Sequence, residues 1–396
     1  MSKTALVLNG FCRNSLAITR SLARKGIICD IVHWSRGHAG QEQFLVNHKS
    51  KTVRKVWFLK RERHLEQLLE VLAHQEYDYL FAGGTTDSLL ISKHKTTLEK
   101  YCRVAMEDWS EVERVHDKSN LISEAARLGI PVPQTFSVDR IEDLQHEQPS
   151  FDPPYILKFS DSYASIGLET YRGDKDGLYA YFAEHYHAAP ALPIIQQLIE
   201  GDLVDACTFS VEGEAKAILC QKRLFTAWIT GGGGFVNQTI EAPKLAEYAR
   251  RLLSHFSWSG HLEMDWIYDA AADEYYIIEI NPKYWGTTQL TIDAGFDFPA
   301  MSVQWMEGEE IPAQEHYQTG LVYRWLEEEM DAILIHGKGL SGLKLWLGFV
   351  GRFFRFGTHY NIYGFRDPRP FRGNFQSILK KHLKHKIAGP KGGAQR

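Results

Sequence analysis

The alternation of short apolar runs with amphipathic segments in the first hundred residues most limits the fold of this chain. The runs TALVLNG, IICDIVHW and YDYLFAG have the length and composition of buried strands. Between them, SLAITRSLARKG and HLEQLLEVLAHQ have helical spacing, and the first of these ends on Gly. A strand, helix and strand in succession form a right-handed unit with parallel strands. Residues 1–105 are therefore predicted to form a doubly wound α/β domain.

The pattern changes after residue 105, where strand hairpins dominate. Turns are predicted at Glu200–Gly201 and Glu212–Gly213, and residues 260–282 have the pattern of a further hairpin. The glycine run at 231–234 predicts a mobile loop, because glycine has the widest backbone freedom. The expected fold class is α/β in the N-terminal part and α+β in the rest.

Composition excludes several classes of protein. The five cysteines lack CxxC spacing, which argues against a zinc site or a disulfide framework and favours a reducing, cytoplasmic location. The first apolar run is too short for a signal peptide, and no apolar stretch approaches the ~18 residues of a membrane-spanning helix. The N-terminal domain lacks G-x-G-x-x-G, so a nicotinamide-dependent oxidoreductase is an alternative of low weight.

Polar side chains on the last hairpin indicate a metal site. In YYIIEINPKYWG, Glu279 and Asn281 share one face of a strand, and Tyr276, Ile278 and Ile280 are expected on the other. If the turn brings Asp265 opposite Glu279, three oxygen ligands suited to Mg²⁺ converge. A solvated polar face of an antiparallel sheet is the alternative.

Two further segments have the composition of a nucleotide site. Lys158 ends an apolar strand and precedes a loop of small residues, whose N–H groups are able to cradle phosphate. In IIQQLIEG, Gln196 and Gln197 lie in an apolar segment whose extended backbone is suited to adenine. A flexible hairpin and a core strand with an edge amide are the respective alternatives.

The order of these motifs is more specific than any one of them. DKSNLISEAARLGIPVPQT, ILKFSDSYASIG, IIQQLIEGD, LEMDWI and IIEINPKYWGTTQL follow one another in the chain. Together they resemble the ATP-grasp superfamily, in the carboxylate–amine ligase-like branch related to carbamoyl-phosphate synthetase and biotin carboxylase, over roughly residues 1–312. The resemblance implies a pre-ATP-grasp domain at 1–105 and an ATP-grasp domain at 106–312, with lobes of about 106–190 and 191–312. Residues 313–396 remain as a C-terminal extension.

The resemblance also implies roles for individual residues. The phosphates of ATP would contact Lys118 and Lys158, with residues 160–167, including Ser165 and Gly167, as a flap. The nucleoside would lie against Gln196, Gln197, Leu198 and Ile199, with Asp202 or Asp205 on the ribose. Mg²⁺ (or Mn²⁺) would be held by Asp265, Glu279 and Asn281, and Arg223 and Lys283 would face the reacting groups.

The implied reaction is ATP-dependent ligation. A carboxylate would become an acyl phosphate, which an amine then attacks; both substrates would be small molecules. A phosphotransferase with the same ATP site and a non-catalytic ATP-binding scaffold are alternatives. One departure from the family pattern affects substrate recognition: Lys283 stands where the family has Arg, so the bidentate fork is lost.

The C-terminal extension is strongly basic. From residue 332 onward the chain has thirteen Lys and Arg and one acid, Asp367, or about +12, whereas residues 1–331 carry about −16. On a helical wheel, residues 340–357 have a wide apolar face rich in Trp and Phe with a basic edge, as in helices at a membrane surface. The first expectation is a helix docked on the core, followed by a basic tail. Peripheral contact with an anionic membrane on its inner face, through 340–357 and the basic stretch 379–386, is the alternative, and nucleic acid is not expected as a partner.

Overall fold

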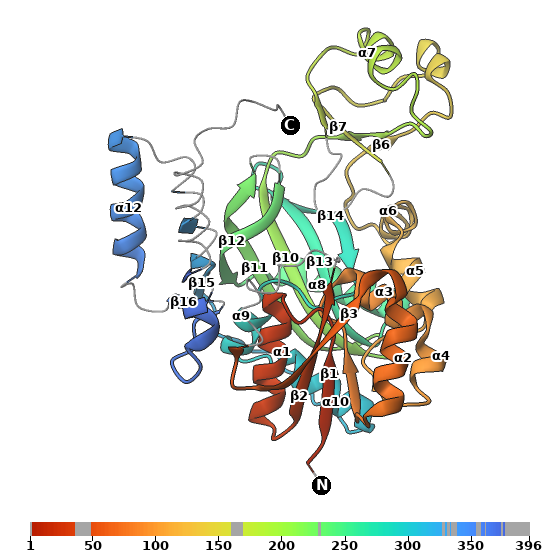
Figure 1. Cartoon of the computed structure of the whole chain (residues 1–396). Coiled ribbons are helices and arrows are strands. Elements are labelled where there is room, and N and C mark those ends of the chain that lie inside the picture. The colour runs from red at the N-terminus through yellow and green to blue at the C-terminus, as the bar shows by residue number, and fades with distance from the viewer. Residues whose placement is uncertain are drawn as a thin grey trace.

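The structure is a computed structural model. It describes residues 2–35, 49–159, 169–228, 231–326, 329–330, 333, 339–353, 358–360, 362–373 and 375–376. Three sheets organise these residues: one of five strands, one of four and one of seven. Figure 1 shows the four-stranded sheet with β6 and β7 at the top, the five-stranded sheet at the bottom and the large sheet between them.

The N-terminal region is the expected doubly wound domain. Its parallel sheet has the order β3-β2-β1-β4-β5, so the chain reverses direction across the sheet between β1 and β4. The strands are β1 (Thr4–Val7), β2 (Ile28–Ser35), β3 (Val53–Lys60), β4 (Tyr79–Phe81) and β5 (Arg103–Val104). The helices are α1 (Arg13–Arg24), α2 (His64–His74), α3 (Thr85–Lys93) and α4 (Lys95–Leu98), with a 3₁₀ turn at Arg61–Arg63.

A small lobe follows two connecting helices, α5 (Trp109–His116) and α6 (Lys118–Arg127). Its antiparallel sheet has the order β6-β9-β7-β8. The strands are β6 (Thr135–Phe136), β7 (Tyr155–Lys158), β8 (Glu169–Tyr171) and β9 (Ile194–Gln197), packed against α7 (Leu178–His185) and a 3₁₀ turn at Ile141–Gln145. The expected lobe boundary at 190/191 separates β9 from its own sheet, so in this respect it is wrong. Strand β9 ends the small lobe, and the chain then crosses into the large sheet.

The large lobe is built on the order β14-β13-β10-β11-β12-β15-β16. The strands are β10 (Asp202–Val211), β11 (Glu214–Trp228), β12 (Gly231–Ile240), β13 (Gly260–Asp269), β14 (Glu274–Asn281), β15 (Val322–Arg324) and β16 (Thr358–Tyr360). The helices are α8 (Pro243–Phe256), α9 (Thr288–Asp293), α10 (Phe298–Glu307) and α12 (Gly339–Phe353). Strands β15 and β16 extend the sheet with residues that the sequence assigns to the C-terminal extension.

Two local predictions from the sequence are corrected. Gly231–Gly234 lie in strand β12, not in a mobile loop, because β11 pairs with them. On β14 a β-bulge opposite Asp265 and Trp266 adds one residue, so Ile277 and Ile280 are both buried in the core. The expected alternation, with Ile278 and Ile280 on one face, fails there because a bulge shifts every following side chain by one position.

The N-terminal domain and the large lobe share a hydrophobic core. One cluster joins Val7 and Phe81 of the parallel sheet to Phe209 of β10 and Phe298 of α10. Asn14, at the start of α1, donates hydrogen bonds to the carbonyl oxygens of Gly83 (2.7 Å) and Tyr284 (2.8 Å). The carboxyl ends of β1 and β4 therefore face the segment that follows β14.

Candidate active site

The hairpin of β13 and β14 places the predicted carboxylates opposite each other. Asp265 pairs with Glu279, and Glu263 pairs with Asn281, in the antiparallel register. The Asn281 amide donates a hydrogen bond to Glu279 Oε1 at 3.0 Å, which holds the two side chains side by side. The convergence that the sequence predicted is thus present in the backbone register of this hairpin.

Two lysines from other elements face Glu279. Lys118 is the first residue of α6, and its Nζ lies 3.3 Å from Glu279 Oε2. Lys158, at the end of β7, is only 5% exposed. Burial and, after it, the charge of Lys118 lower the pKa of Lys158 to about 8, although Glu279 opposes the shift. The small lobe and α6 therefore bring two cations to the edge of the large lobe.

Arg223 on β11 is held by two carboxylates. It donates to Asp205 on β10, and its Nη2 lies 3.0 Å from Asp265 Oδ1. Gln221 also donates to Asp205 Oδ2 at 2.8 Å. Burial, with the charges of Glu263 and Glu279, raises the pKa of Asp265 to about 6, although Arg223 and Lys283 oppose the shift. Asp265 thus lies between two cations, Arg223 and Lys283, and two carboxylates, Glu263 and Glu279, and its raised pKa is due first to burial.

Glu263 is the residue that sequence reasoning missed. One oxygen each of Asp205, Glu263 and Asp265 lies within 4.8 Å of the others. Glu263 also accepts a hydrogen bond from Lys283 Nζ at 2.5 Å. The signal was available, because Glu263 and Asp265 are two apart on one strand and must share a face.

A cavity of about 520 Å³ lies beside the predicted adenine-binding segment. It is lined by Gln197, Leu198 and Ile199, by Asp202, and by the turn between β13 and β14. Asp202 accepts from Lys222 Nζ at 2.6 Å. The cavity has the size of a small-molecule site.

Gln196 and Asp205 lie elsewhere. The Gln196 side chain is buried and donates to Thr135 Oγ1 at 2.9 Å, because successive strand residues point to opposite faces. Asp205 is 1% exposed and is engaged by Arg223, so of the two candidates for the ribose only Asp202 borders the cavity. Neither Gln196 nor Asp205 lines this cavity. Ser165, Gly167 and the rest of the predicted flap at 160–167 lie outside the described residues.

The donor set fits a hard divalent cation. Carboxylate oxygens of Asp265 and Glu279 and the amide oxygen of Asn281 are ligands that Mg²⁺ accepts, and Mg²⁺ commonly takes its remaining ligands from phosphate and water. Burial raises the pKa of Glu279, but Lys118 and Asn281 outweigh burial and the pKa is lowered. Glu279 is therefore ionised near neutral pH and suited to bind a cation.

Two lobes with lysines and carboxylates where they meet, behind a doubly wound domain, are the arrangement that the resemblance to the ATP-grasp superfamily predicts. Residues 204–329 match the family described as ATP-grasp in the biosynthetic pathway with Ter operon. The chain is 23% identical over 298 residues to the carbamoyl phosphate synthase large chain, C-terminal section, of Methanopyrus kandleri, covering 70% of this chain and 54% of that protein. It therefore spans about half the length of this curated relative.

Solved structures show the same fold. A biotin carboxylase–β,γ-ATP complex from Campylobacter jejuni has a TM-score of 0.63 at 14% identity, over 80% of this chain and 74% of that one. An L-amino acid ligase from Bacillus licheniformis has a TM-score of 0.57 at 13% identity, over 76% and 73%. The resemblance to the ATP-grasp superfamily is confirmed.

Proposed function

We propose that this protein is an ATP-dependent ligase that activates a carboxylate as an acyl phosphate and joins it to an amine. The observation that carries the proposal is the pairing of Asp265 with Glu279 across one hairpin, with Lys118 on Glu279 and Arg223 on Asp265. The names of the similar proteins, a biotin carboxylase, a carbamoyl phosphate synthase and an L-amino acid ligase, agree with ATP-driven bond formation.

Each residue has a definable part in such a reaction. We assign Lys118 and Lys158, which lie beside Glu279, to the phosphates of ATP, and the cavity at 197–202 to the nucleoside. Asp265, Glu279 and Asn281 would hold Mg²⁺, which neutralises phosphate charge when it is bound. Arg223 and Lys283 carry positive charge in the same region, and such charges stabilise a phosphoryl group in transfer.

A screen of phosphate release tests the proposal. The purified chain is incubated with Mg-ATP and pairs of small carboxylates and amines, and both released phosphate and new amide are measured. Turnover that requires both substrates and yields an amide supports the ligase. ADP formed with a phosphorylated carboxylate and no amide would identify a phosphotransferase instead. The identity of the two substrates is the result the screen delivers.

We also infer that α12 is a membrane-contacting helix. Leu340, Leu343, Leu347 and Val350 are 80, 55, 64 and 49% exposed, while Phe349 lies under the Arg324 guanidinium, 5.1 Å from its ring centre. Figure 1 shows α12 at the outer side of the molecule, beyond β15 and β16. No helix among the described residues is both long and apolar enough to cross a bilayer. The basic stretch 379–386, which lies outside the described residues, would add attraction to anionic lipid.

Cosedimentation with vesicles tests this role of α12. The native chain should pellet with phosphatidylglycerol vesicles at low salt, and Leu343→Glu with Leu347→Glu should remain in the supernatant. The exposed pair Leu224→Glu and Phe225→Glu on β11 serves as the matched control and should pellet as the native chain does. If the α12 variant pellets equally well, the helix does not bind the membrane.

A further inference from the structure

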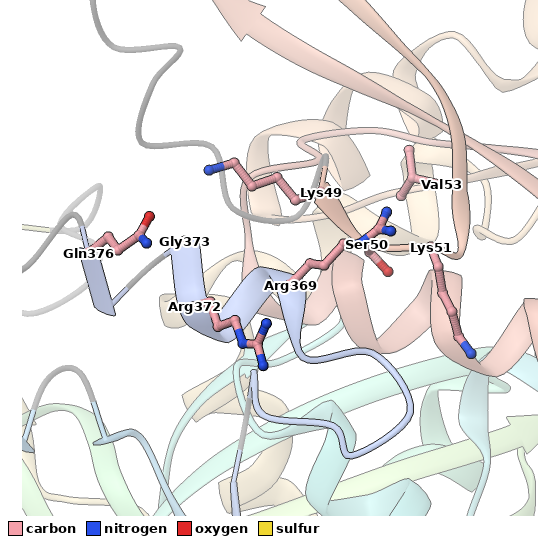
Figure 2. Close-up of a pocket in the computed structure, with 8 residues that line it drawn as sticks. All are labelled: Lys49, Ser50, Lys51, Val53, Arg369, Arg372, Gly373 and Gln376. Atoms are coloured by element: carbon pink, nitrogen blue, oxygen red, sulfur yellow. The ribbon is translucent and has the colours of Figure 1, made fainter.

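A second cavity lies far from the carboxylate hairpin in the fold. It measures about 470 Å³ and is lined on one side by residues 49–51 and 53, before and at the start of β3, and on the other by Arg369, Arg372, Gly373 and Gln376, near the end of the described chain. Figure 2 shows Arg369 and Arg372 on the second segment, with the Arg369 side chain reaching toward Ser50 on the first. The cavity therefore joins the N-terminal domain to the C-terminal extension.

Its position separates it from the ATP site. Val53 pairs with Cys29, near the start of β2, so the cavity lies at the amino edge of the parallel sheet. Asn14 and Gly83 lie at the opposite, carboxyl edge of the sheet, where Asn14 also bonds to Tyr284, just after the β13–β14 hairpin. A ligand in this cavity would not touch the residues assigned to ATP.

The lining is cationic. Lys49, Lys51, Arg369 and Arg372 border the cavity, and no Asp or Glu does. Among the residues that the structure describes, none of these four cations forms a salt bridge. The nearest acid along the chain, Asp367, is buried and already matched: it accepts hydrogen bonds from Arg20 Nη2 (3.0 Å), Ser50 Oγ (2.6 Å) and the Lys51 N–H (3.1 Å). Asp367 is therefore paired with Arg20, and the four cations line a cavity whose described lining holds no acidic residue.

The same hydrogen bonds hold the two walls of the cavity in fixed positions. Asp367 ties the 362–373 segment to Ser50 and Arg20, and Arg20 also donates to the Ile362 carbonyl at 2.9 Å. Ser50 is 3% exposed, so this junction excludes water. Arg369 and Arg372 thus line one wall of the cavity, Lys49 and Lys51 line the other, and Asp367 fixes the two walls to each other. Arginine presents a planar fork that matches phosphate oxygens, and lysine adds a point charge.

We propose that this cavity binds a phosphoryl group of a ligand other than the ATP that is used in the reaction. The ligand is a phosphorylated molecule, and its phosphoryl group belongs either to a free small molecule or to the headgroup of an anionic phospholipid. The volume admits the phosphorylated part of a small metabolite. The site binds through exposed cations, so its affinity falls as salt rises.

The test uses the full chain and inorganic pyrophosphate without Mg²⁺, measured by calorimetric titration at low salt. Arg369→Gln with Arg372→Gln should weaken binding at least tenfold. Lys49→Gln with Lys51→Gln, on the other wall, should also weaken pyrophosphate binding. This second variant keeps the test valid if the arginine variant is less stable. Arg140→Gln with Arg250→Gln removes the same charge from exposed positions and should leave binding unchanged. Lys158→Ala should also retain binding, which separates this site from the ATP site.

A second arm identifies the source of the phosphoryl group. Native chain and the arginine variant are sedimented with phosphatidylglycerol and with phosphatidylcholine vesicles. Pyrophosphate binding that the arginine variant loses assigns a free phosphorylated ligand. Pelleting with phosphatidylglycerol that the arginine variant loses, without pyrophosphate binding, assigns a lipid headgroup. The proposal is overturned if neither ligand binds, or if the control pair weakens binding as much as the cavity variants do.

Discussion

At the scale of single residues, the site depends on charges that are buried together. Lys158, at the end of β7 in the small lobe, loses hydration on burial, and its pKa is lowered to about 8. Asp265 loses hydration on the facing lobe, and its pKa rises to about 6. The sequence placed both residues among the candidates for the site. The direction of each pKa shift, however, depends on neighbours that only the fold brings together.

The pKa of Lys158 makes ATP affinity depend on pH. The amine is positive below its pKa, so its attraction for phosphate is present below pH 8 and is lost as pH rises through 8. We expect the dissociation constant of ATP to rise by up to about tenfold per pH unit above pH 8. Lys158→Ala should bind weakly at every pH and lack this slope, and Lys60→Ala, at an exposed position, should keep it. Displacement of a fluorescent nucleotide between pH 7.5 and 9.5 measures all three proteins; a slope that persists in Lys158→Ala would remove Lys158 from the site.

The paired carboxylates give the second prediction at this scale. Asp265→Asn and Glu279→Gln should each reduce ATP turnover at least a hundredfold, because the charge that holds the cation is removed. Circular dichroism and the melting temperature should stay close to those of the native chain. Glu247→Gln, on the exposed face of α8, is the matched control and should be fully active. Turnover retained in both site variants would contradict the assignment of the metal ligands.

At the scale of elements, the hairpin shows what sequence is able to predict. Opposite placement of Asp265 and Glu279 followed from alternation and a short turn, and it is confirmed. The bulge beside Trp266 was not predictable, because no residue type in that stretch requires one. The prediction of a mobile loop at 231–234 was wrong for a related reason. Glycine composition indicates backbone freedom, but pairing with β11 decides the conformation of this segment.

Gly83 illustrates a constraint between elements. A Cβ there would lie 2.0 Å from the Leu8 carbonyl oxygen and 2.4 Å from Ser15 Oγ, so the segment after β4 lies too close to the end of β1 and the start of α1 for any side chain. We expect Gly83→Ala to lower the free energy of unfolding by about 1–3 kcal/mol or more. Gly351→Ala, on α12 with open space around it, should be neutral or stabilise by at most about 1 kcal/mol. Urea denaturation compares the two; equal stabilities would show that β4 and α1 separate at no cost.

At the scale of the whole molecule, Asn14 links the N-terminal domain to the large lobe. Removal of its side chain leaves two buried carbonyl oxygens, of Gly83 and Tyr284, without their donor. Asn14→Ala should therefore lower the free energy of unfolding by about 1–3 kcal/mol. Asn120→Ala removes an exposed hydrogen bond to the Arg114 carbonyl and should cost less than about 1 kcal/mol. A loss for Asn14→Ala no greater than that for Asn120→Ala, in the same denaturation assay, would show that the link contributes nothing.

This link lay beyond the sequence. The order of the motifs predicted a doubly wound domain followed by two lobes, because local periodicity and turn residues determine elements of that kind. Asn14 and Tyr284 are 270 positions apart, and no sequence pattern in either segment predicts their contact. The same holds for Glu263, whose ion pair with Lys283 depends on how the segment after β14 leaves the sheet.

The bond between Ser50 and Asp367 has a consequence for how the chain is made. These two residues are 317 positions apart, and a ribosome that adds ~5–20 residues per second needs roughly 15–60 seconds to cover that distance. During this interval the 49–53 segment has emerged while Asp367, its acceptor, does not yet exist. Arg20 and Ser50 therefore stay hydrated during this interval. Their hydrogen bonds to Asp367 form only after this part of the C-terminal extension has been synthesised.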